Sequence, residues 1–331
     1  DVVWQIGTGY FGCRSDDGTF NADLFGEQAT DDQVKMIEIK ISQGAKPGHG
    51  GVLPAAKITR EIADTRKVPI GQDCVSPPGH SAFATPNELC EWIGRLRELS
   101  GGKPIGFKLC VGMPHEFLAI CKAMITTGIL PDFINVDGAE GGTGAAPIEF
   151  SNSVGAPLVD GLVFVHSALV GCGLRDKIKV ACAGKVTSAA HIVRNVAIGA
   201  DWCNAARGFM MAVGCIQAQQ CHTNECPVGV ATQEPTRYRA LHVGDKSQRV
   251  YHFHHNTMES LSELVAAIGL DRPDQLRPHH VLKRIGPNRV AAYEDAYVFL
   301  NEGALLEGRS GHAVFDDHWA FASADTFARV S

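Results

Sequence analysis

The chain has 331 residues, of which 45% are hydrophobic and 20% are charged, and this balance indicates a globular protein with a buried core rather than a disordered one. Its 30 Lys+Arg against 36 Asp+Glu give a formal net charge of −6 without any basic block, so nucleic acid is not an expected partner. Eleven cysteines, with no signal peptide ahead of Asp1, predict reduced thiols in a cytoplasmic protein. A segment upstream of this chain could still attach the protein to a membrane.

Short apolar runs rich in Val and Ile alternate with helical patterns along most of the chain. The expected strands are Val2–Ile6, Met36–Lys40, Val68–Cys74, Pro104–Cys110, Phe133–Asp137, Ile178–Ala183 and Trp202–Ala205. The expected helices cover residues 20–34, 54–66, 86–99, 114–128, 159–173 and 187–198. Asp160 and His166 interrupt the longest apolar stretch, residues 154–174, which therefore predicts a buried helix and not a membrane span.

This alternation predicts an α/β fold, and two features favour a (β/α)8 TIM barrel. Polar residues (Gln5, Lys40, Lys108 and Asp137) stand at the carboxyl ends of the strands, where barrels of this kind place their active sites. The strands are also evenly spaced. Because only seven strands are counted, we expect the first barrel strand to lie upstream of this chain.

The pattern changes after the last expected strand. Residues 246–269 read as one helix, and residues 272–331 alternate short helices with polar loops. We therefore expect two parts: a barrel domain over residues 1–240 and a C-terminal helical extension over residues 241–331.

A first chemical segment runs from Ile39 to Gly51. Lys40 ends a buried strand, and Gln43 and Lys46 follow on a glycine-rich loop that lets the backbone approach a ligand closely. Two cations at one cavity mouth suit a dianionic ligand or an electron-rich ring. The alternative is a solvated surface loop, but Lys40 is harder to explain in that way because lysine is rarely buried without a partner.

Two further segments suit an anion. The glycine-rich loop from Asp137 to Pro147 offers backbone N–H groups, although such a loop is a weak signal on its own. After the last two strands come Gly184-Lys185 and Ala206-Arg207, in the position where these barrels usually bind phosphate. The alternative is that each cation pairs with a nearby carboxylate.

Three cysteines (Cys215, Cys221 and Cys226) fall within twelve residues of a polar segment, and proline follows the last of them. Three thiolates suit a soft metal. An iron–sulfur cluster, zinc with His222 as the fourth ligand, and no metal at all remain open from spacing alone. The short distance in sequence from the last strand favours an electron carrier near the active-site face.

Taken together, these segments resemble the FMN-binding glutamate synthase family over residues 5–233. The motifs that carry the resemblance are Ile39 to Gly51, Gly141 to Ala145, and Gly214 to Gln233 with its Cys-Pro-Val-Gly-Val-Ala-Thr-Gln run. The resemblance implies a (β/α)8 barrel that holds FMN and a [3Fe–4S] cluster with Cys215, Cys221 and Cys226 as ligands. It also supports an earlier strand upstream.

The resemblance assigns roles residue by residue. Lys40, Lys108 and Asp137 fall beside the flavin ring, and Gln43 and Lys46 fall on the pair expected to hold 2-oxoglutarate, with Arg66 as a third candidate. The other expected FMN contacts are Gln5, Thr8, Gly9, Gly141, Gly142, Thr143, Gly184, Lys185, Ala206 and Arg207. Glu140 and the Ala205-Ala206-Arg207 segment depart from the family pattern, so the phosphate contacts are expected to differ in detail from those of the family.

The implied reaction is the reductive amination of 2-oxoglutarate to L-glutamate, with hydride transfer from reduced FMN to 2-iminoglutarate. The cluster would relay electrons from ferredoxin or an NAD(P)H-oxidising subunit. No amidotransferase domain is recognisable, so ammonia would come from solution or from glutamine hydrolysed by a partner subunit, and we expect an oligomer. The alternatives are a related flavoenzyme that makes an N-substituted glutamate, such as an N-methylglutamate synthase component, a non-catalytic electron-transfer subunit, or an IMP-dehydrogenase-like barrel with a catalytic cysteine.

Overall fold

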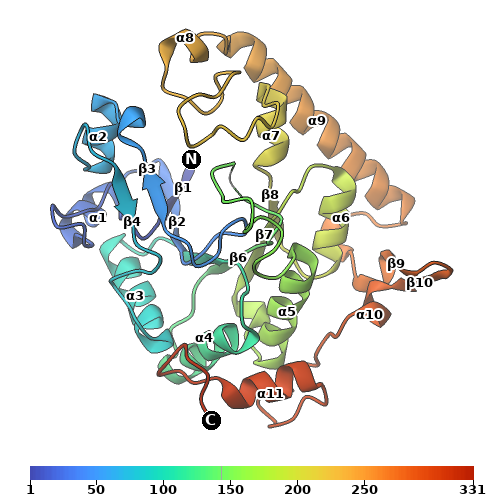
Figure 1. Ribbon diagram of the computed structural model, residues 1–331. Coiled ribbons are helices and arrows are strands. Elements are labelled where there is room, and N and C mark those ends of the chain that lie inside the picture. Colours follow the sequence, from blue (N-terminus) through green and yellow to red (C-terminus); the bar gives the residue numbers. More distant parts are fainter. Residues whose placement is uncertain (143) are drawn as a thin grey trace.

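The computed structural model describes residues 1–142 and 144–331, and its centre is a curved parallel sheet (Figure 1). Within these residues the sheet has six strands in the order β1-β2-β5-β6-β7-β8. Their bounds are β1 Val2–Ile6, β2 Val34–Lys40, β5 Ile105–Leu109, β6 Phe133–Asp137, β7 Lys179–Ala183 and β8 Trp202–Asn204. Parallel pairing requires a crossover between neighbouring strands, and most of the crossovers carry helices. The predicted α/β class with a barrel-like sheet is thereby confirmed.

Alternation along the strands gives the sheet two different faces. Ile37, Ile39, Phe107 and Ile134 are fully buried against the surrounding helices and belong to the main hydrophobic core. The residues between them, such as Glu38 and Lys108, face the concave side. Because side chains alternate with a period of two, a single strand supplies both the core and the site.

The helices next to the sheet are α1 Ala22–Ala29, α3 Pro86–Leu99, α4 Pro114–Thr127, α5 Leu158–Gly171 and α6 Ala189–Ala197. The start of α3 shows why the chain becomes helical there. The Thr85 hydroxyl accepts from the Glu88 backbone N–H, the Glu88 carboxylate accepts from the Thr85 N–H, and Pro86 occupies the first helical position. The buried helix expected within residues 154–174 is α5, and none of the helices in the described part of the chain has the length and hydropathy needed to cross a bilayer.

The strand predicted at Val68–Cys74 is wrong. Lys67 and Gly71 have φ angles of +56° and +78°, and Pro69 between them lacks an N–H, so this stretch forms turns. Instead, β4 Cys74–Ser76 pairs antiparallel with β3 Gly51–Leu53 in a small separate sheet. This small sheet lies beside α2 Arg60–Arg66 and the short 3₁₀ helix η1 Ala55–Lys57.

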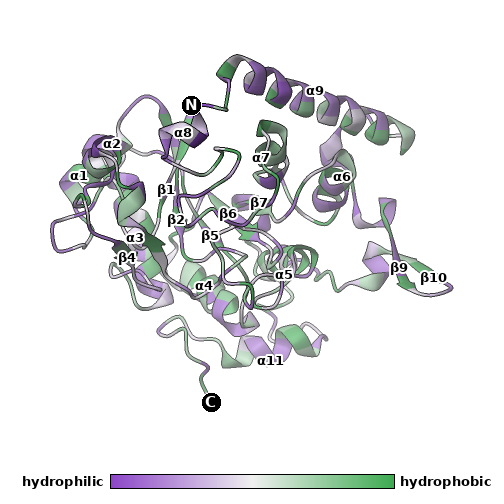
Figure 2. Cartoon of the chain, turned by 45° about the horizontal axis from the view of Figure 1, so that its top comes forward, coloured by the Kyte–Doolittle hydropathy of each residue, from purple (hydrophilic) through white to green (hydrophobic). Residues whose placement is uncertain are grey.

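The C-terminal region follows α7 Arg207–Val213 and α8 Pro235–Tyr238. The predicted helix at 246–269 is confirmed as α9 Val243–Ala267, which Figure 2 shows banded with both hydrophilic and hydrophobic residues. Beyond it lie η3 Pro273–Gln275, η4 Pro278–His280, α10 Tyr293–Ala296 and α11 Ala313–Phe321, with η2 Arg175–Lys177 earlier in the chain.

The expectation of helices and loops alone after residue 272 is wrong, because β9 Leu282–Gly286 and β10 Arg289–Ala292 form an antiparallel hairpin. Gly286 and Pro287 at its turn supply residue types that favour a chain reversal. Further on, Phe315 of α11 stacks on Phe164 of α5 with ring centroids 5.3 Å apart. The C-terminal segment is thereby joined to the main core, and the division of the chain at residue 240 remains a prediction.

Candidate active site

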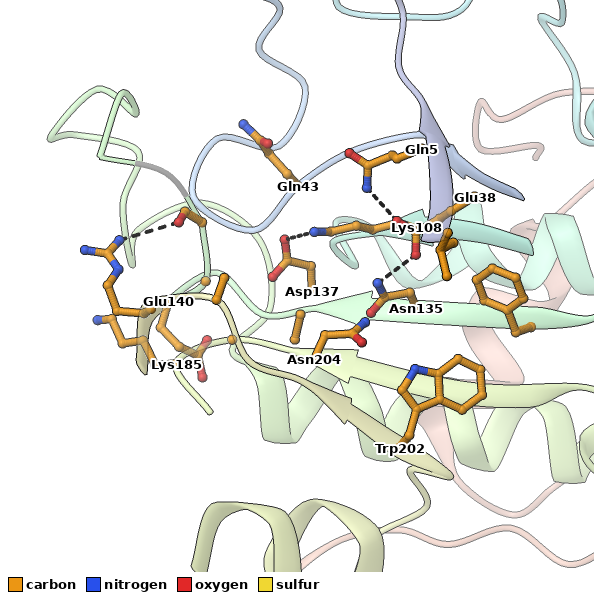
Figure 3. A pocket seen from close by; sticks show the side chains of 18 of the residues that line it. Gln5, Glu38, Gln43, Lys108, Asn135, Asp137, Glu140, Lys185, Trp202 and Asn204 are labelled. Carbon is orange, nitrogen blue, oxygen red and sulfur yellow. Dashed lines mark hydrogen bonds and ion pairs between the residues drawn. The ribbon is translucent and has the colours of Figure 1, made fainter. Parts of the chain in front are cut away.

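A cavity of about 480 Å³ occupies the concave side of the sheet (Figure 3). Its lining includes Gln5 of β1 and Asn204 of β8, so the sheet curves far enough to bring its two end strands to one cavity. This volume is in the range of sites that hold a cofactor or a drug-sized ligand. Several predicted site residues line it together: Gln5, Gln43, Lys108, Asp137, Gly141, Gly142, Gly184, Lys185, Ala206 and Arg207.

Asp137 links three segments at the carboxyl ends of the strands. Its carboxylate forms an ion pair with Lys108 of the adjacent strand, with Nζ 3.0 Å from Oδ2, and its side chain is almost fully buried. The same Oδ2 accepts a hydrogen bond of 2.9 Å from the Gly44 N–H. A Cβ at Gly44 would lie 1.8 Å from the Gly138 carbonyl oxygen, so only glycine allows this approach. Asp137 thus fixes the loop that carries Gln43 and Lys46.

Glu38 is a site residue that the sequence analysis missed. Its buried carboxylate accepts from Gln5 Nε2 at 2.5 Å and from Asn135 Nδ2 at 2.8 Å, as Figure 3 shows. The Oδ1 of Asn135 is buried without a hydrogen-bond partner in the described part of the chain. An unpaired buried oxygen is costly, so this amide carries an unsatisfied acceptor next to the cavity that Asn135 lines.

A second cavity of about 230 Å³ adjoins the first, and Gln5 and Gln43 line both. Its other walls bring together Lys40, Lys46, Thr8 and Gly9. The sequence analysis expected Lys40, Thr8 and Gly9 among the flavin contacts and Lys46 at 2-oxoglutarate, but all four line this smaller cavity and none lines the larger one. Here Thr8 Oγ1 donates to the Pro77 carbonyl at 2.7 Å, and Lys46 Nζ donates to the Gly50 carbonyl at 3.0 Å. Gln43 on the loop after β2 and Gln5 of β1 therefore form the partition between the two cavities.

The cations around both cavities are only partly neutralised. Burial lowers the pKa of Lys40, and the nearby positive charges of Lys108 and Lys46 lower it further, against the opposing effect of Asp137 and Glu38. Burial also lowers the pKa of Lys46. In the part of the chain that the structure describes, Lys108 has the Asp137 carboxylate, whereas Lys40 and Lys46 make no ion pair. Such an environment favours a ligand that brings negative charge.

The end of the larger cavity at which the sequence analysis expected phosphate contacts is built from loops. Arg207 Nη2 reaches the Gly142 carbonyl at 3.5 Å, and Lys185 Nζ donates to Asn152 Oδ1 at 3.1 Å. Gly142 has a φ of +119°, and a Cβ there would lie 2.0 Å from the Ala45 Cβ. Glu140 lines the same cavity as the two cations, and its carboxylate accepts from the Leu158 N–H at the start of α5. The predicted contact Thr143 lies outside the described residues.

Arg66 is not brought to either cavity. It sits near the end of α2, and its guanidinium lies over the Phe11 ring, 5.0 Å from the centroid. Phe11 itself lines the smaller cavity, so Arg66 contacts a wall residue of that cavity but does not line it.

Cys215, Cys221 and Cys226 line one small cavity of about 10 Å³. Burial acts to raise the pKa of Cys226, but the backbone N–H groups of residues 228–231 outweigh it and lower that pKa, which favours a thiolate. Even so, no group of three or more Cys, His, Asp or Glu side chains in the described residues has the arrangement of a metal site. The three thiols have the donor chemistry that a soft metal prefers, but their side chains are not arranged as a ligand shell in this structure.

The cysteine segment lies against the site. A Cβ at Gly144 would be 2.5 Å from the Cys221 Sγ, and Gly144 belongs to the glycine loop whose Gly141 and Gly142 line the larger cavity. Lys57 Nζ also donates to the Cys221 carbonyl oxygen. The expectation that this segment lies near the carboxyl ends of the strands agrees with these contacts.

Comparison with known proteins gives consistent matches. Residues 1–271 match the family model described as the conserved region in glutamate synthase. The chain is 41% identical over 284 residues to the glutamate synthase large subunit-like protein YerD of Bacillus subtilis, covering 86% of this chain and 54% of that protein. It is 35% identical over 243 residues to the ferredoxin-dependent glutamate synthase of Antithamnion sp., covering 73% of this chain and 15% of that protein.

Among solved structures, a mutant flavocytochrome b2 with pyruvate bound aligns with 92% of this chain and 58% of that chain, at 13% identity and a TM-score of 0.46. The chain spans about half the length of the curated relatives it matches first.

Proposed function

Because the chain belongs to the glutamate synthase family, whose members are oxidoreductases acting on CH–NH2 groups, we propose that it forms the FMN-binding synthase part of such an enzyme. The proposed reaction is the reductive amination of 2-oxoglutarate to L-glutamate. The observation that carries this proposal is the pair of adjoining cavities, one large enough for a cofactor and one lined by Lys40 and Lys46, which share Gln5 and Gln43 as walls.

The larger cavity fits FMN in its chemistry. Lys185 and Arg207 stand at its loop end for the phosphate, and the close approach of Gly142 to Ala45 leaves backbone rather than side chain facing the ligand. Lys108, which forms an ion pair with Asp137, is the cation that would lie near the flavin ring. When bound, FMN supplies hydride transfer to the 2-imino carbon of 2-iminoglutarate.

The smaller cavity fits 2-oxoglutarate. Lys46 and Gln43 would bind its carboxylates, and Lys40 lines the same cavity. Removing these charged groups from water strengthens their attraction for a dianion. The Asp137 contact to Gly44 would hold Gln43 and Lys46 in the position that binds the substrate next to the ring.

Two single substitutions test the assignment of the two cavities. Lys46→Ala should weaken 2-oxoglutarate binding about 10- to 100-fold while the FMN content is unchanged, because a charged hydrogen bond contributes roughly 1.5–3 kcal/mol. Arg207→Ala should do the reverse and weaken FMN binding with little effect on 2-oxoglutarate. Flavin fluorescence and calorimetric titration measure the two affinities. Loss of FMN in Lys46→Ala would place this lysine at the cofactor, and an unaffected 2-oxoglutarate affinity would remove it from the substrate site.

We further propose that Cys215, Cys221 and Cys226 ligate a [3Fe–4S] cluster once the loop closes around it, because their thiols share one small cavity beside the glycine loop. Cys221→Ser should remove most of the iron and acid-labile sulfide from anaerobically purified protein, whereas Cys13→Ser in the core should not. Unchanged iron content in Cys221→Ser would contradict the ligand assignment.

The partners belong to the same proposal. One relative is named for ferredoxin, and others are named for NADPH, so either class of electron donor suits the family. The nitrogen donor is ammonia, free or released from glutamine by a partner subunit.

A further inference from the structure

Two cysteines lie side by side on the helix-facing side of the sheet, away from both cavities of the candidate site. Cys182 of β7 and Cys203 of β8 are register partners, and their Sγ atoms are 3.5 Å apart. Neighbouring strands are about 4.8 Å apart, which falls within the Cα separations that disulfides span. A rotation of the two side chains therefore suffices to bring the sulfur atoms to a bonding distance of about 2.05 Å.

The surroundings make the two thiols unequal. Asn195 of α6 is fully buried, and its Nδ2 lies 3.9 Å from the Cys203 Sγ. Its Oδ1 accepts from Arg194 Nε at 3.1 Å and from Nη2 at 3.0 Å, which fixes the amide with its NH2 toward the sulfur. The Cys182 thiol, Asn195 and Arg194 lower the pKa of Cys203 against the effect of burial, whereas the pKa of Cys182 is raised. Cys203 is therefore the better nucleophile.

Cys203 is also the accessible member of the pair. It is half-buried and lines an apolar cavity of about 480 Å³ between α6, α7 and α9, whose walls include Ile192, Phe209 and Phe253. A second pair of neighbouring thiols, Cys121 and Cys172, offers a contrast. Both are buried in the main core, and burial raises the pKa of Cys121. The two thiols are close together in both pairs. Only the Cys182–Cys203 pair has a member whose pKa is lowered and which lines a cavity.

We propose that Cys182 and Cys203 form a redox-sensitive dithiol that hydrogen peroxide converts to a disulfide. The Cys203 thiolate attacks the peroxide, so that an S–O bond forms and the O–O bond breaks, and the leaving oxygen takes a proton to become water. The Cys182 sulfur then attacks the Cys203 sulfur, so that the S–S bond forms and the S–O bond breaks. The departing hydroxide takes the Cys182 proton, giving a second water. The two sulfurs lose two electrons in total, and the peroxide gains them.

Oxidation would covalently join β8 to β7. Strand β8 has only three residues, Trp202–Asn204, and it is followed after Ala205 by Ala206 and Arg207, which line the larger cavity of the candidate site. The disulfide would therefore hold the base of that loop in place. The dithiol chemistry itself does not depend on what fills the larger cavity, so it is tested separately from the proposed synthase function.

Peptide mapping tests the proposal on the purified chain. Reduced protein is treated with one equivalent of hydrogen peroxide, alkylated with iodoacetamide and digested with trypsin without reductant. Cys182 and Cys203 fall on separate tryptic peptides, residues 180–185 and 195–207, while the three clustered cysteines fall on residues 208–237. The expected product is the disulfide-linked pair of the first two, at least 10-fold above any linked pair from residues 109–122 and 123–175, of which the former carries Cys121 together with Cys110 and the latter carries Cys172.

Variants and a variant-free measurement complete the test. Cys203→Ser should abolish the linked pair, and Cys182→Ser should leave a Cys203 sulfenic acid that dimedone traps. In the unmodified protein, iodoacetamide should alkylate Cys203 at least 10-fold faster than Cys121, a result that needs no variant to fold. The proposal is overturned if Cys121 reacts as fast as Cys203, if Cys203 links to the 208–237 peptide instead, or if peroxide leaves Cys203 fully alkylatable.

Discussion

The two faces of the parallel sheet differ in what their buried residues do. On the helix side, Ile37, Phe107 and Ile134 fill the core, where close packing supplies stability. On the concave side, Glu38 and Asp137 are almost as deeply buried but carry charge, and each is held by hydrogen bonds or an ion pair from a different strand or loop. Burial alone therefore does not distinguish core from site in this protein, whereas the chemistry of the partners does.

The largest expected effect tests the helix side. Phe107→Ala should lower the free energy of unfolding by about 3–5 kcal/mol, because it removes a fully buried ring from a closely packed core. Urea unfolding followed by circular dichroism measures this loss. Lys35→Ala on the adjacent strand β2, whose side chain is exposed, is the matched control and should change stability by less than about 0.5 kcal/mol. Equal losses in the two variants would contradict the assignment of Phe107 to a closely packed core.

The second prediction concerns the pH dependence of stability and His80, which contacts the end of strand β2. His80 Nε2 lies 2.9 Å from the Lys40 carbonyl, and burial lowers the His80 pKa to about 4. Because the unfolded pKa is near 6.5, the unfolded chain binds the proton first as the pH falls. Stability is therefore full above pH 6.5 and is lost progressively toward pH 4, by up to about 3 kcal/mol from this residue.

His80→Gln provides the control for this pH effect, since its amide can still donate to the Lys40 carbonyl but cannot gain a proton. Urea midpoints at pH 7 and pH 4.5 should differ less in this variant than in the unmodified protein. His166 also has a pKa lowered to about 4, so part of the pH dependence should remain. An unchanged difference between the two midpoints would show that His80 does not titrate as proposed.

The smallest expected effect tests the concave side. Glu38→Gln leaves one acceptor oxygen for the two amide donors of Gln5 and Asn135, so one donor loses its partner. We expect a loss of about 1–3 kcal/mol in the free energy of unfolding, from the same urea experiment. Glu91→Gln on the exposed face of α3 is the matched control and should be neutral. If Glu38→Gln were equally neutral, the hydrogen bonds at Glu38 would contribute no net stability.

Local signals in the sequence predicted much of this architecture. The cap residue Thr85 and Pro86 mark the start of α3, and the Val- and Ile-rich runs mark the six strands of the main sheet. The failure at Val68–Cys74 has a local cause, because Pro69 and Gly71 outweigh the β-branched residues around them. The β9–β10 hairpin was missed because its strands are short and largely exposed, so they carry little hydrophobic pattern.

The site was predicted less evenly. Lys40, Gln43 and Lys46 stand on one short segment, so their convergence follows from local sequence, and the structure places all three at one cavity. Glu38 and Asn135 were missed because each lies inside a strand that reads as apolar, and their contact joins residues 97 positions apart. Alternation on β2, which puts Met36 and Glu38 on the same face, is the signal that could have found Glu38.

The partition formed by Gln5 and Gln43 has a thermodynamic consequence. Since both side chains face the two cavities, a molecule that orders them from one side alters the cost of binding on the other. The two binding equilibria then share a single coupling free energy, and each ligand must change the affinity of the other by the same factor. Two amide side chains in one shared wall thereby couple the binding of a ligand in one cavity to the binding of a ligand in the other.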